Sequence, residues 1–138
     1  MIAGKNEINN VAGNPDRKDK EMRTTNQSAY SAVMAKEKFT ASNMFAEWMK
    51  IGLVNSDNGV LFKELYVVYS YGYHFPMWVW DESAGQWIGN KDKYSRSTTR
   101  QQSQTRPSNI TTWLNTEEMK KVVQWGGLAE FVMKKAQV

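Results

Sequence analysis

Residues 65–80 read LYVVYSYGYHFPMWVW, and no other segment of the chain is as rich in β-branched and aromatic residues. Such residues favour the pleated, half-buried surface of a β-sheet. Gly72, His74 and Pro76 interrupt the run, and glycine and proline mark turns. The segment therefore predicts a hairpin of two central strands, over about residues 64–71 and 76–82. Both faces of the first strand are largely apolar or aromatic, so both faces of the sheet need cover.

The segments on either side of this hairpin extend the sheet. After a turn at residues 82–85, residues 86–89 predict a short third strand that completes an antiparallel meander. Residues 44–51 fit two structures. Helical spacing gives a one-sided apolar stripe behind a Ser or Asn cap, whereas alternation gives a strand. Periodicity alone favours the helix, and the family resemblance described below favours the strand. Residues 28–38 contain good helix formers, which makes a helix possible there.

The C-terminal part of the chain shows a clear helical pattern. Thr116 precedes two acids, Glu117 and Glu118, as is typical of a helix N-terminus. Apolar residues follow at helical spacing, and the pair Gly126-Gly127 separates a second helical piece. We expect two short helices within residues 115–136 to pack over the sheet. The predicted fold class is therefore α+β, a small antiparallel β-meander covered by C-terminal helices.

The N-terminal segment, residues 1–28, is polar and has no regular apolar spacing, which predicts a flexible leader. A chain of 138 residues has room for one ordinary core, so we expect a single domain over residues 29–138. The chain has no Cys, no apolar signal segment at its start and no run of ~18 apolar residues. These features predict a cytoplasmic protein without a membrane partner.

The sequence lacks the residues and motifs that several classes of enzyme and metal site require. His74 is the one histidine, so no histidine pair is available to bind a metal. The glycine-rich nucleotide loops and the GxSxG motif of hydrolases are also missing. We expect no catalytic residue, no metal and no cofactor. The one enzymatic hypothesis requires His74, Glu47 and Ser70 to meet at a single cleft.

The most distinctive surface candidate is the segment 91–106. Residues 94–112 hold many hydroxyls and amides and three Arg but no acid, and the chain as a whole has a mild net charge of +4. A long structureless loop is uncommon in a compact domain, so we expect residues 97–105 to form a short polar helix or an extended strip on the sheet. Arg and hydroxyl groups suit phosphates. The alternative is a solvated loop whose side chains bond to their own backbone.

The candidate nucleic-acid-binding residues are Lys91, Lys93, Tyr94, Ser95, Arg96, Thr98, Thr99, Arg100, Gln101 and Arg106. Four aromatic residues are candidates for stacking on unpaired bases, namely Tyr71, Tyr73, Trp78 and Trp80.

Three segments carry a resemblance to a known family: NMFAEW at residues 43–48, LYVVYSYGYHFPM at 65–77 and DKYSRSTTRQQSQTRP at 92–107. Over about residues 39–107 the chain resembles a small domain encoded by bacteriophages, prophages and plasmids. The signatures are YSYG followed by HFP, and KYS followed by Ser-Thr. The family commonly has a histidine where this chain has Gln101. If that position works by hydrogen bonding, Gln101 can replace the histidine, which favours binding over catalysis there.

These observations together predict a non-enzymatic accessory protein of a phage or other mobile element, acting in the cytoplasm of a bacterial host. It would bind nucleic acid through the basic, hydroxyl-rich strip beside an aromatic sheet. The alternative is a protein-binding inhibitor or modulator of a host or defence complex, because protein interfaces also use exposed aromatic rings and Arg.

Overall fold

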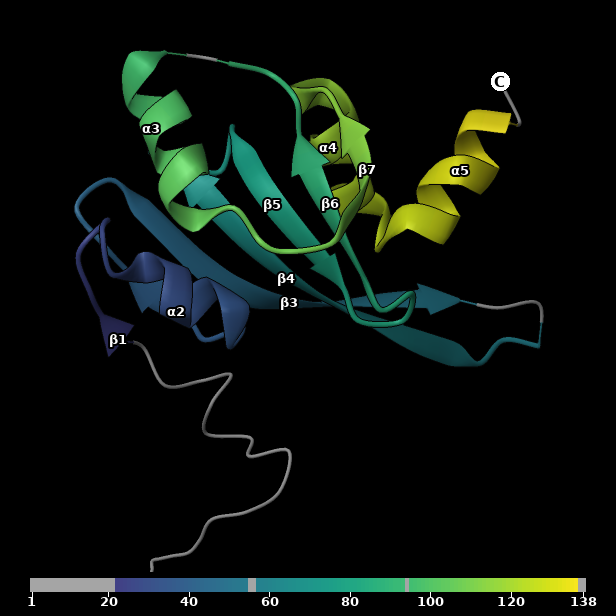
Figure 1. Cartoon of the computed structure of the whole chain (residues 1–138). Coiled ribbons are helices and arrows are strands. Elements are labelled where there is room, and N and C mark those ends of the chain that lie inside the picture. The colour runs from purple at the N-terminus through teal and green to yellow at the C-terminus, as the bar shows by residue number, and fades with distance from the viewer. Residues whose placement is uncertain (1–21, 55–56, 94, 137–138) are drawn as a thin grey trace, which may run out of the picture.

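The computed structural model describes residues 22–54, 57–93 and 95–136 (Figure 1). Within these residues the chain forms a seven-stranded sheet whose spatial order follows the sequence from β1 to β7. The strands are β1 (Met22–Arg23), β2 (Phe39–Thr40), β3 (Met44–Val54), β4 (Val60–Ser70), β5 (Pro76–Asp81), β6 (Gln86–Asn90) and β7 (Ile110–Leu114). The helices are α2 (Ala29–Met34), α3 (Arg96–Thr105), α4 (Thr116–Trp125) and α5 (Leu128–Ala136).

The fold class is α+β, but the sheet is mixed and not antiparallel throughout. Strands β2 to β6 pair antiparallel with their neighbours, whereas β1 pairs parallel with β2 and β7 pairs parallel with β6. A parallel pair needs a crossover connection, often a helix. Helix α2 supplies it between β1 and β2, and α3 supplies it between β6 and β7. The expectation of a wholly antiparallel sheet is therefore wrong at both edges.

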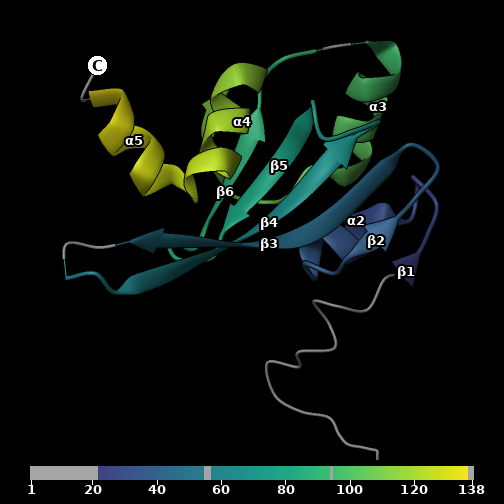
Figure 2. The same cartoon turned by 180° about the vertical axis from the view of Figure 1, so that it is seen from behind.

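Residues 44–51 are a strand, which decides between the two structures that the sequence allowed. Strand β3 pairs with β4 along its whole length, from Met44 opposite Ser70 to Val54 opposite Val60. Apolar residues on both faces of β3 give the segment its helix-like spacing, because each face of the strand packs against a different core. The distal ends of β3 and β4 project past the other strands (Figures 1 and 2).

Helices lie on both faces of the sheet. On one face α2 and α3 pack over a core that includes Tyr66, Val68 and Trp78. On the other face α4 and α5 contribute Met119 and Phe131 to a second core against the opposite residues of β4 and β5 (Figure 2). The C-terminal helices thus cover one face only, and the polar helix α3 contributes to the cover of the other.

The two C-terminal helices meet at a glycine pair held by a buried carboxylate. Gly126 ends α4 in the left-handed conformation, with φ of 89°. A Cβ on Gly127 would lie 2.7 Å from Asp81 Oδ2, so only glycine fits there. That oxygen accepts a hydrogen bond from Leu128 N at 2.8 Å and so caps the start of α5. The glycine pair therefore separates two helices, as predicted.

The expected leader falls mainly outside the described residues, which begin at Met22. Its last part, residues 22–28, holds β1 and the residues that precede α2. Among the described helices, none is both long and apolar enough to cross a bilayer.

Candidate functional site

The face of helix α3 that packs on the sheet is polar. Thr98, Gln101, Gln102 and Thr105 are buried. The sheet supplies their partners: Trp78 Nε1 donates to Thr105 Oγ1 at 2.9 Å, and Gln102 Nε2 donates to the main-chain oxygen of Asn90 at 3.1 Å. Buried polar groups are stable only when hydrogen-bonded, and these are. A helix with almost no apolar residue can therefore pack on the sheet.

A cleft of about 340 Å³ lies beside α3, and we call it the α3 cleft. Its lining residues are Asn26, Asn43, Arg96, Ser97, Arg100, Gln101 and Gln104. They supply two guanidinium groups, four amides and one hydroxyl, and none of them carries a carboxylate. In the part of the chain that the structure describes, neither Arg96 nor Arg100 takes part in an ion pair. The cleft is therefore electropositive and suited to an anionic ligand.

Asn43 is the centre of a hydrogen-bond network that forms one wall of the α3 cleft. Its Oδ1 accepts from Asn26 Nδ2 at 2.7 Å and from Gln101 Nε2 at 2.6 Å. Gln101 Oε1 in turn accepts from the buried hydroxyl of Ser70. Both ends of the Gln101 amide are thus engaged, which fixes its orientation. These hydrogen bonds hold Asn43 and Gln101 in one geometry.

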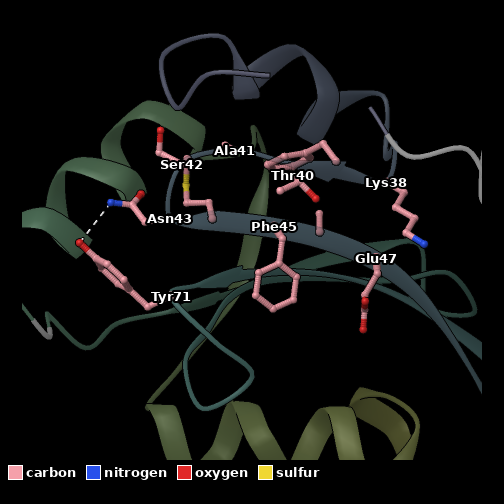
Figure 3. A pocket seen from close by; sticks show the side chains of 11 residues that line it. Lys38, Thr40, Ala41, Ser42, Asn43, Phe45, Glu47 and Tyr71 are labelled. Atoms are coloured by element: carbon pink, nitrogen blue, oxygen red, sulfur yellow. Dashed lines mark hydrogen bonds between the residues drawn. The ribbon is translucent and has the colours of Figure 1, made fainter. Parts of the chain in front are cut away.

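Tyr71 stands at the rim of the α3 cleft and joins the network to α3. Its hydroxyl accepts from Asn43 Nδ2 at 3.2 Å and shares a hydrogen bond of 2.5 Å with Ser97 Oγ (Figure 3). The side chain is 54% exposed, and the residue has φ of 65°, a backbone conformation that a bulky residue rarely adopts. Such strained positions cluster at functional sites.

Two of the residues that line the α3 cleft each have a side-chain oxygen that is shielded from solvent and has no hydrogen-bond partner among the described residues. They are Asn26 Oδ1 and Gln104 Oε1. Because Asn26 uses its Nδ2 on Asn43, its amide orientation is set and its Oδ1 is left unpaired. An unpaired buried acceptor costs free energy. Because neither oxygen is accessible to solvent, a ligand in the cleft reaches them only if these side chains move.

A second hollow, of about 430 Å³, shares Asn43 with the α3 cleft, and Tyr71 is among its lining residues (Figure 3). Residues 38–47, the β2–β3 hairpin, form most of its lining. Its lining includes one cation, Lys38, and one acid, Glu47, and the carboxylate of Glu47 accepts from Tyr73 OH at 3.2 Å. This hollow lacks the set of converging polar groups that marks the α3 cleft.

The cations predicted from the sequence divide among several places. Arg96 and Arg100 line the α3 cleft. Lys93 lies on the other side of α3, with its Nζ 3.4 Å from Gln102 Oε1. The guanidinium group of Arg106 lies 5.0 Å from the centre of the Trp113 ring. Lys91 lies near Glu118, in the first turn of α4. The predicted strip is therefore not one continuous patch.

Several predicted contact residues are turned inward. Thr98, Gln101 and Trp78 are almost completely buried. Thr98 and Trp78 therefore cannot contact nucleic acid bound at the surface, and their prediction as contact residues is wrong. Gln101 reaches the α3 cleft only as part of its wall. Ser95 Oγ caps α3 by accepting from Thr98 N at 3.1 Å, and Thr99 Oγ1 bonds to Ser95 O. Tyr94 lies outside the described residues.

The aromatic candidates also separate. Trp80 is half-buried beneath Lys36, whose Nζ lies 4.1 Å from the ring centre, and its Nε1 donates to Glu82 at 2.7 Å. Tyr73 packs with Phe45 and Tyr69 at ring distances of 5.1 and 4.9 Å, on the α4 and α5 face. Of the four predicted rings, Tyr71 is the one that borders the α3 cleft.

The hypothetical catalytic group is not assembled. Ser70 pairs with Met44 and hydrogen-bonds to α3, whereas Glu47 pairs with Val67, whose side chain belongs to the opposite core. Ser70 and Glu47 therefore lie on opposite faces of the sheet. No cluster of three His, Asp or Glu residues suited to a metal occurs among the described residues.

Sequence reasoning missed three residues of the α3 cleft as contacts: Asn26, Asn43 and Gln104. Asn43 precedes β3 by one residue, and its main-chain oxygen accepts from Tyr71 N at 2.8 Å. The pairing of β3 with β4 places Asn43 next to Tyr71. The sequence does not give this pairing, because residues 44–51 fit a helix as well as a strand.

Comparison of the chain with protein-family models, with curated proteins and with solved structures finds no match.

Proposed function

We propose that this protein binds nucleic acid through the α3 cleft and the adjoining outer face of α3. The observation that carries the proposal is the pair Arg96 and Arg100, without ion-pair partners in the described chain, at a cleft whose lining has no carboxylate. Residues four apart lie on the same face of a helix, so both guanidinium groups can reach one phosphate or two neighbouring phosphates. Arg binds phosphate in a forked, charge-assisted geometry.

The other groups of the α3 cleft suit the rest of a nucleotide. The amide of Gln104, which the hydrogen-bond network around Asn43 does not include, can donate to a base edge. The exposed ring of Tyr71 offers a surface on which a base can stack. Lys93 and Arg106 are exposed just before and just after α3, outside the α3 cleft, and the proposal does not depend on them. No chemical step is part of this function.

The biological role that we propose is that of an accessory protein of a phage or other mobile element, acting in the cytoplasm of its bacterial host. The ground for this role is the set of motifs YSYG, HFP and KYS, by which residues 39–107 resemble domains encoded by such elements.

The test is fluorescence anisotropy with labelled single-stranded and duplex oligonucleotides over a series of salt concentrations. The double variant Arg96→Gln/Arg100→Gln should bind at least about tenfold more weakly than the wild type. Its salt slope should fall by about one to two, because each lost phosphate contact contributes about 0.7 to 0.9.

A matched control is Lys121→Gln/Lys134→Gln, which removes the same charge from exposed residues of α4 and α5 on the other face. We expect this control to bind nearly as well as the wild type. Undetectable binding of any oligonucleotide at low salt, or equal losses in the two double variants, would contradict the proposal.

A protein-binding role, as an inhibitor or modulator of a host complex, is the second candidate. The observation in its favour is the projecting end of the β3–β4 hairpin, where Val54, Val60, Leu61 and Phe62 are between 51% and 74% exposed. Clustered exposed apolar residues mark interaction sites. A nuclease-treated pull-down from bacterial lysate should then capture a protein with the wild type and lose it with Phe62→Ser. Identical capture by both proteins would count against this second candidate.

A further inference from the structure

We propose that two copies of this chain associate through the free edge of β3, with the two β3 strands antiparallel about a twofold axis at Gly52. The partner of the edge is thus a second copy of the same chain. Three features of the β3–β4 hairpin carry the pairing: the direction of the main-chain groups of β3, the glycine at its centre, and the charges at the two ends of the free edge. The pairing is independent of the nucleic-acid binding proposed above.

Alternate residues of β3 direct their main-chain groups away from β4. Met44 O accepts from Ala41 N at 2.8 Å, so it points toward β2. Main-chain direction alternates along a strand, and β3 pairs with β4 without a register shift. The even-numbered residues of β3 therefore point the same way as Met44. At the distal end of the strand these are Lys50, Gly52 and Val54.

Strand β2 is too short to pair with this end of β3. It lies opposite Phe45 and Ala46, and from Lys50 to Val54 no described strand lies on that side of β3. The three outward residues are exposed, and each offers an N–H and a C=O group. A long free edge of this kind is a template for another strand. Because this end of the hairpin projects past the other strands, a second strand can approach it (Figures 1 and 2).

A twofold axis at Gly52 uses all of these outward groups. Lys50 of each copy lies opposite Val54 of the other, Gly52 lies opposite Gly52, and each pair exchanges two main-chain hydrogen bonds. Glycine also permits the close approach of a second backbone. Phe62, directly opposite Gly52 on β4, covers it, because a Cβ there would lie 3.2 Å from Phe62 Cε1. The Phe62 rings of the two copies thus flank the glycine pair and shield its hydrogen bonds from water.

The charges at the ends of the free edge favour a second copy over an unrelated strand. Residues 55–59, at the tip of the hairpin, include one acid, Asp57, and no base. The twofold axis brings Asp57 of one copy toward the end of β2 in the other. Two lysines lie there: Lys38 directly precedes β2, and Lys36 O accepts from Trp48 Nε1 at 2.8 Å. Acid therefore meets base at both ends of the paired strands, a match that an arbitrary peptide lacks.

The pairing also sets how the two copies face. A twofold axis between antiparallel strands is perpendicular to the sheet, so the two sheets join into one and equivalent faces lie on the same side. The α3 helices of both copies, and the clefts beside them, are then on one face of the dimer.

The first test is sedimentation equilibrium of the full chain over a concentration series that reaches about 100 μM. The wild type should shift from the monomer mass toward twice that mass. Val54→Pro removes an outward N–H and keeps the β3–β4 ladder, because this N–H points away from β4. The dimer then loses two hydrogen bonds, one at each end, so the association constant should fall at least about tenfold. Val54→Thr keeps the amide and is the matched control, which should associate nearly as well as the wild type. Circular dichroism melting checks that both variants fold.

The second test reads the register with cysteines, because the chain has none of its own. In the proposed pair the Cα atoms of Lys50 and Val54 from opposite copies lie about 5.5 Å apart, within the range of a disulfide. An equimolar mixture of Lys50→Cys and Val54→Cys should therefore form a disulfide-linked dimer with a mild oxidant. Either variant alone should not, because its two cysteines lie about 14 Å apart, four residues along the strand.

Each result supports or overturns the pairing. A monomer at every concentration overturns it and leaves the β3 edge to a strand of another protein. Equal weakening by Val54→Thr and folded Val54→Pro overturns it in favour of contact through the apolar faces of the hairpin. Disulfide formation by either single variant as fast as by the mixture overturns the twofold register at Gly52.

Discussion

The amide of Asn43 connects three parts of the chain that are far apart in sequence. It links the segment before α2, through Asn26, to α3, through Gln101, and to the end of the central hairpin, through Tyr71. One side chain therefore sets the relative position of the groups around the α3 cleft. The same side chain contributes to stability, because two of its partners, Asn26 and Gln101, are half-buried and buried.

Replacing this side chain tests its role at the residue scale. Asn43→Ala removes the acceptor of Gln101 Nε2 and leaves that buried donor unpaired. We expect the free energy of unfolding to fall by about 1 to 3 kcal/mol, the usual cost of an unpaired buried polar group. Urea denaturation monitored by tryptophan fluorescence measures it. The neighbouring exposed variant Ser42→Ala should change the stability much less, and equal effects of the two variants would contradict the proposed network.

For single residues, the sequence predicts which side chains suit a binding site better than it predicts which of them are exposed. It identified Arg96, Arg100 and Gln101, which do line the cleft. It also placed Thr98 and Trp78 at a surface, although both are buried. Period and composition show that a segment is polar, but not which of its polar side chains meet polar partners across an interface. Thr98 and Trp78 are buried because Ser70 and Thr105, from other elements, satisfy their polar atoms.

Among the elements, α4 shows how electrostatics fix a helix to the body of the protein. A hydrogen bond from Lys135, reinforced by one from Asn115 N, holds the pKa of Glu118 below its usual range. The amide and hydroxyl of Thr116 lower the pKa of Asp92 in the same way, and Thr116 N lies 2.8 Å from Asp92 Oδ2. Both carboxylates therefore contribute to the start of α4 only while they are ionised.

This coupling predicts how stability depends on pH. A carboxylate whose pKa is lower in the folded state than in the unfolded state stabilises the fold above its unfolded pKa. The stabilisation is lost as the pH falls through the folded pKa. The free energy of unfolding should thus decrease below about pH 4, where unperturbed carboxylates begin to protonate.

The variant Glu118→Gln should show a smaller decrease over the same range, because it lacks one of the two groups. Urea titrations of both proteins at neutral and acid pH measure the difference. If the two proteins lose the same free energy of unfolding on acidification, the assignment to Glu118 is wrong.

The elements themselves were predictable to different degrees. Strands β4, β5 and β6 and helices α4 and α5 carry their own turn, cap and apolar signals, and they occur where the sequence indicates them. Strand β7 was missed because its threonine-rich sequence has little apolar alternation. Its neighbour β6 and the crossover helix α3 hold it in place. Strand β3 needed its partner β4 before its structure could be decided.

For the whole molecule, the two crossover helices are the feature that creates the site. Helices α2 and α3 each join a parallel pair at an edge of the sheet, and both lie on the same face (Figure 1). The α3 cleft forms where the segment before α2 meets α3 and the turn between β2 and β3, which contributes Asn43. A local reading of the sequence cannot give this arrangement, since it depends on which edge each helix crosses.

The central claim is that the α3 cleft is the place where nucleic acid binds. The most direct measurement is an NMR titration of the isotope-labelled protein with oligo-dC, following main-chain and side-chain amide signals. Our account predicts that the largest shifts occur at Asn26, Asn43, Gln101 and Gln104 and in the first turns of α3, with little change on α4 and α5. Shifts confined to α4 and α5 or to the projecting end of the β3–β4 hairpin, or no shifts at low salt, would contradict it.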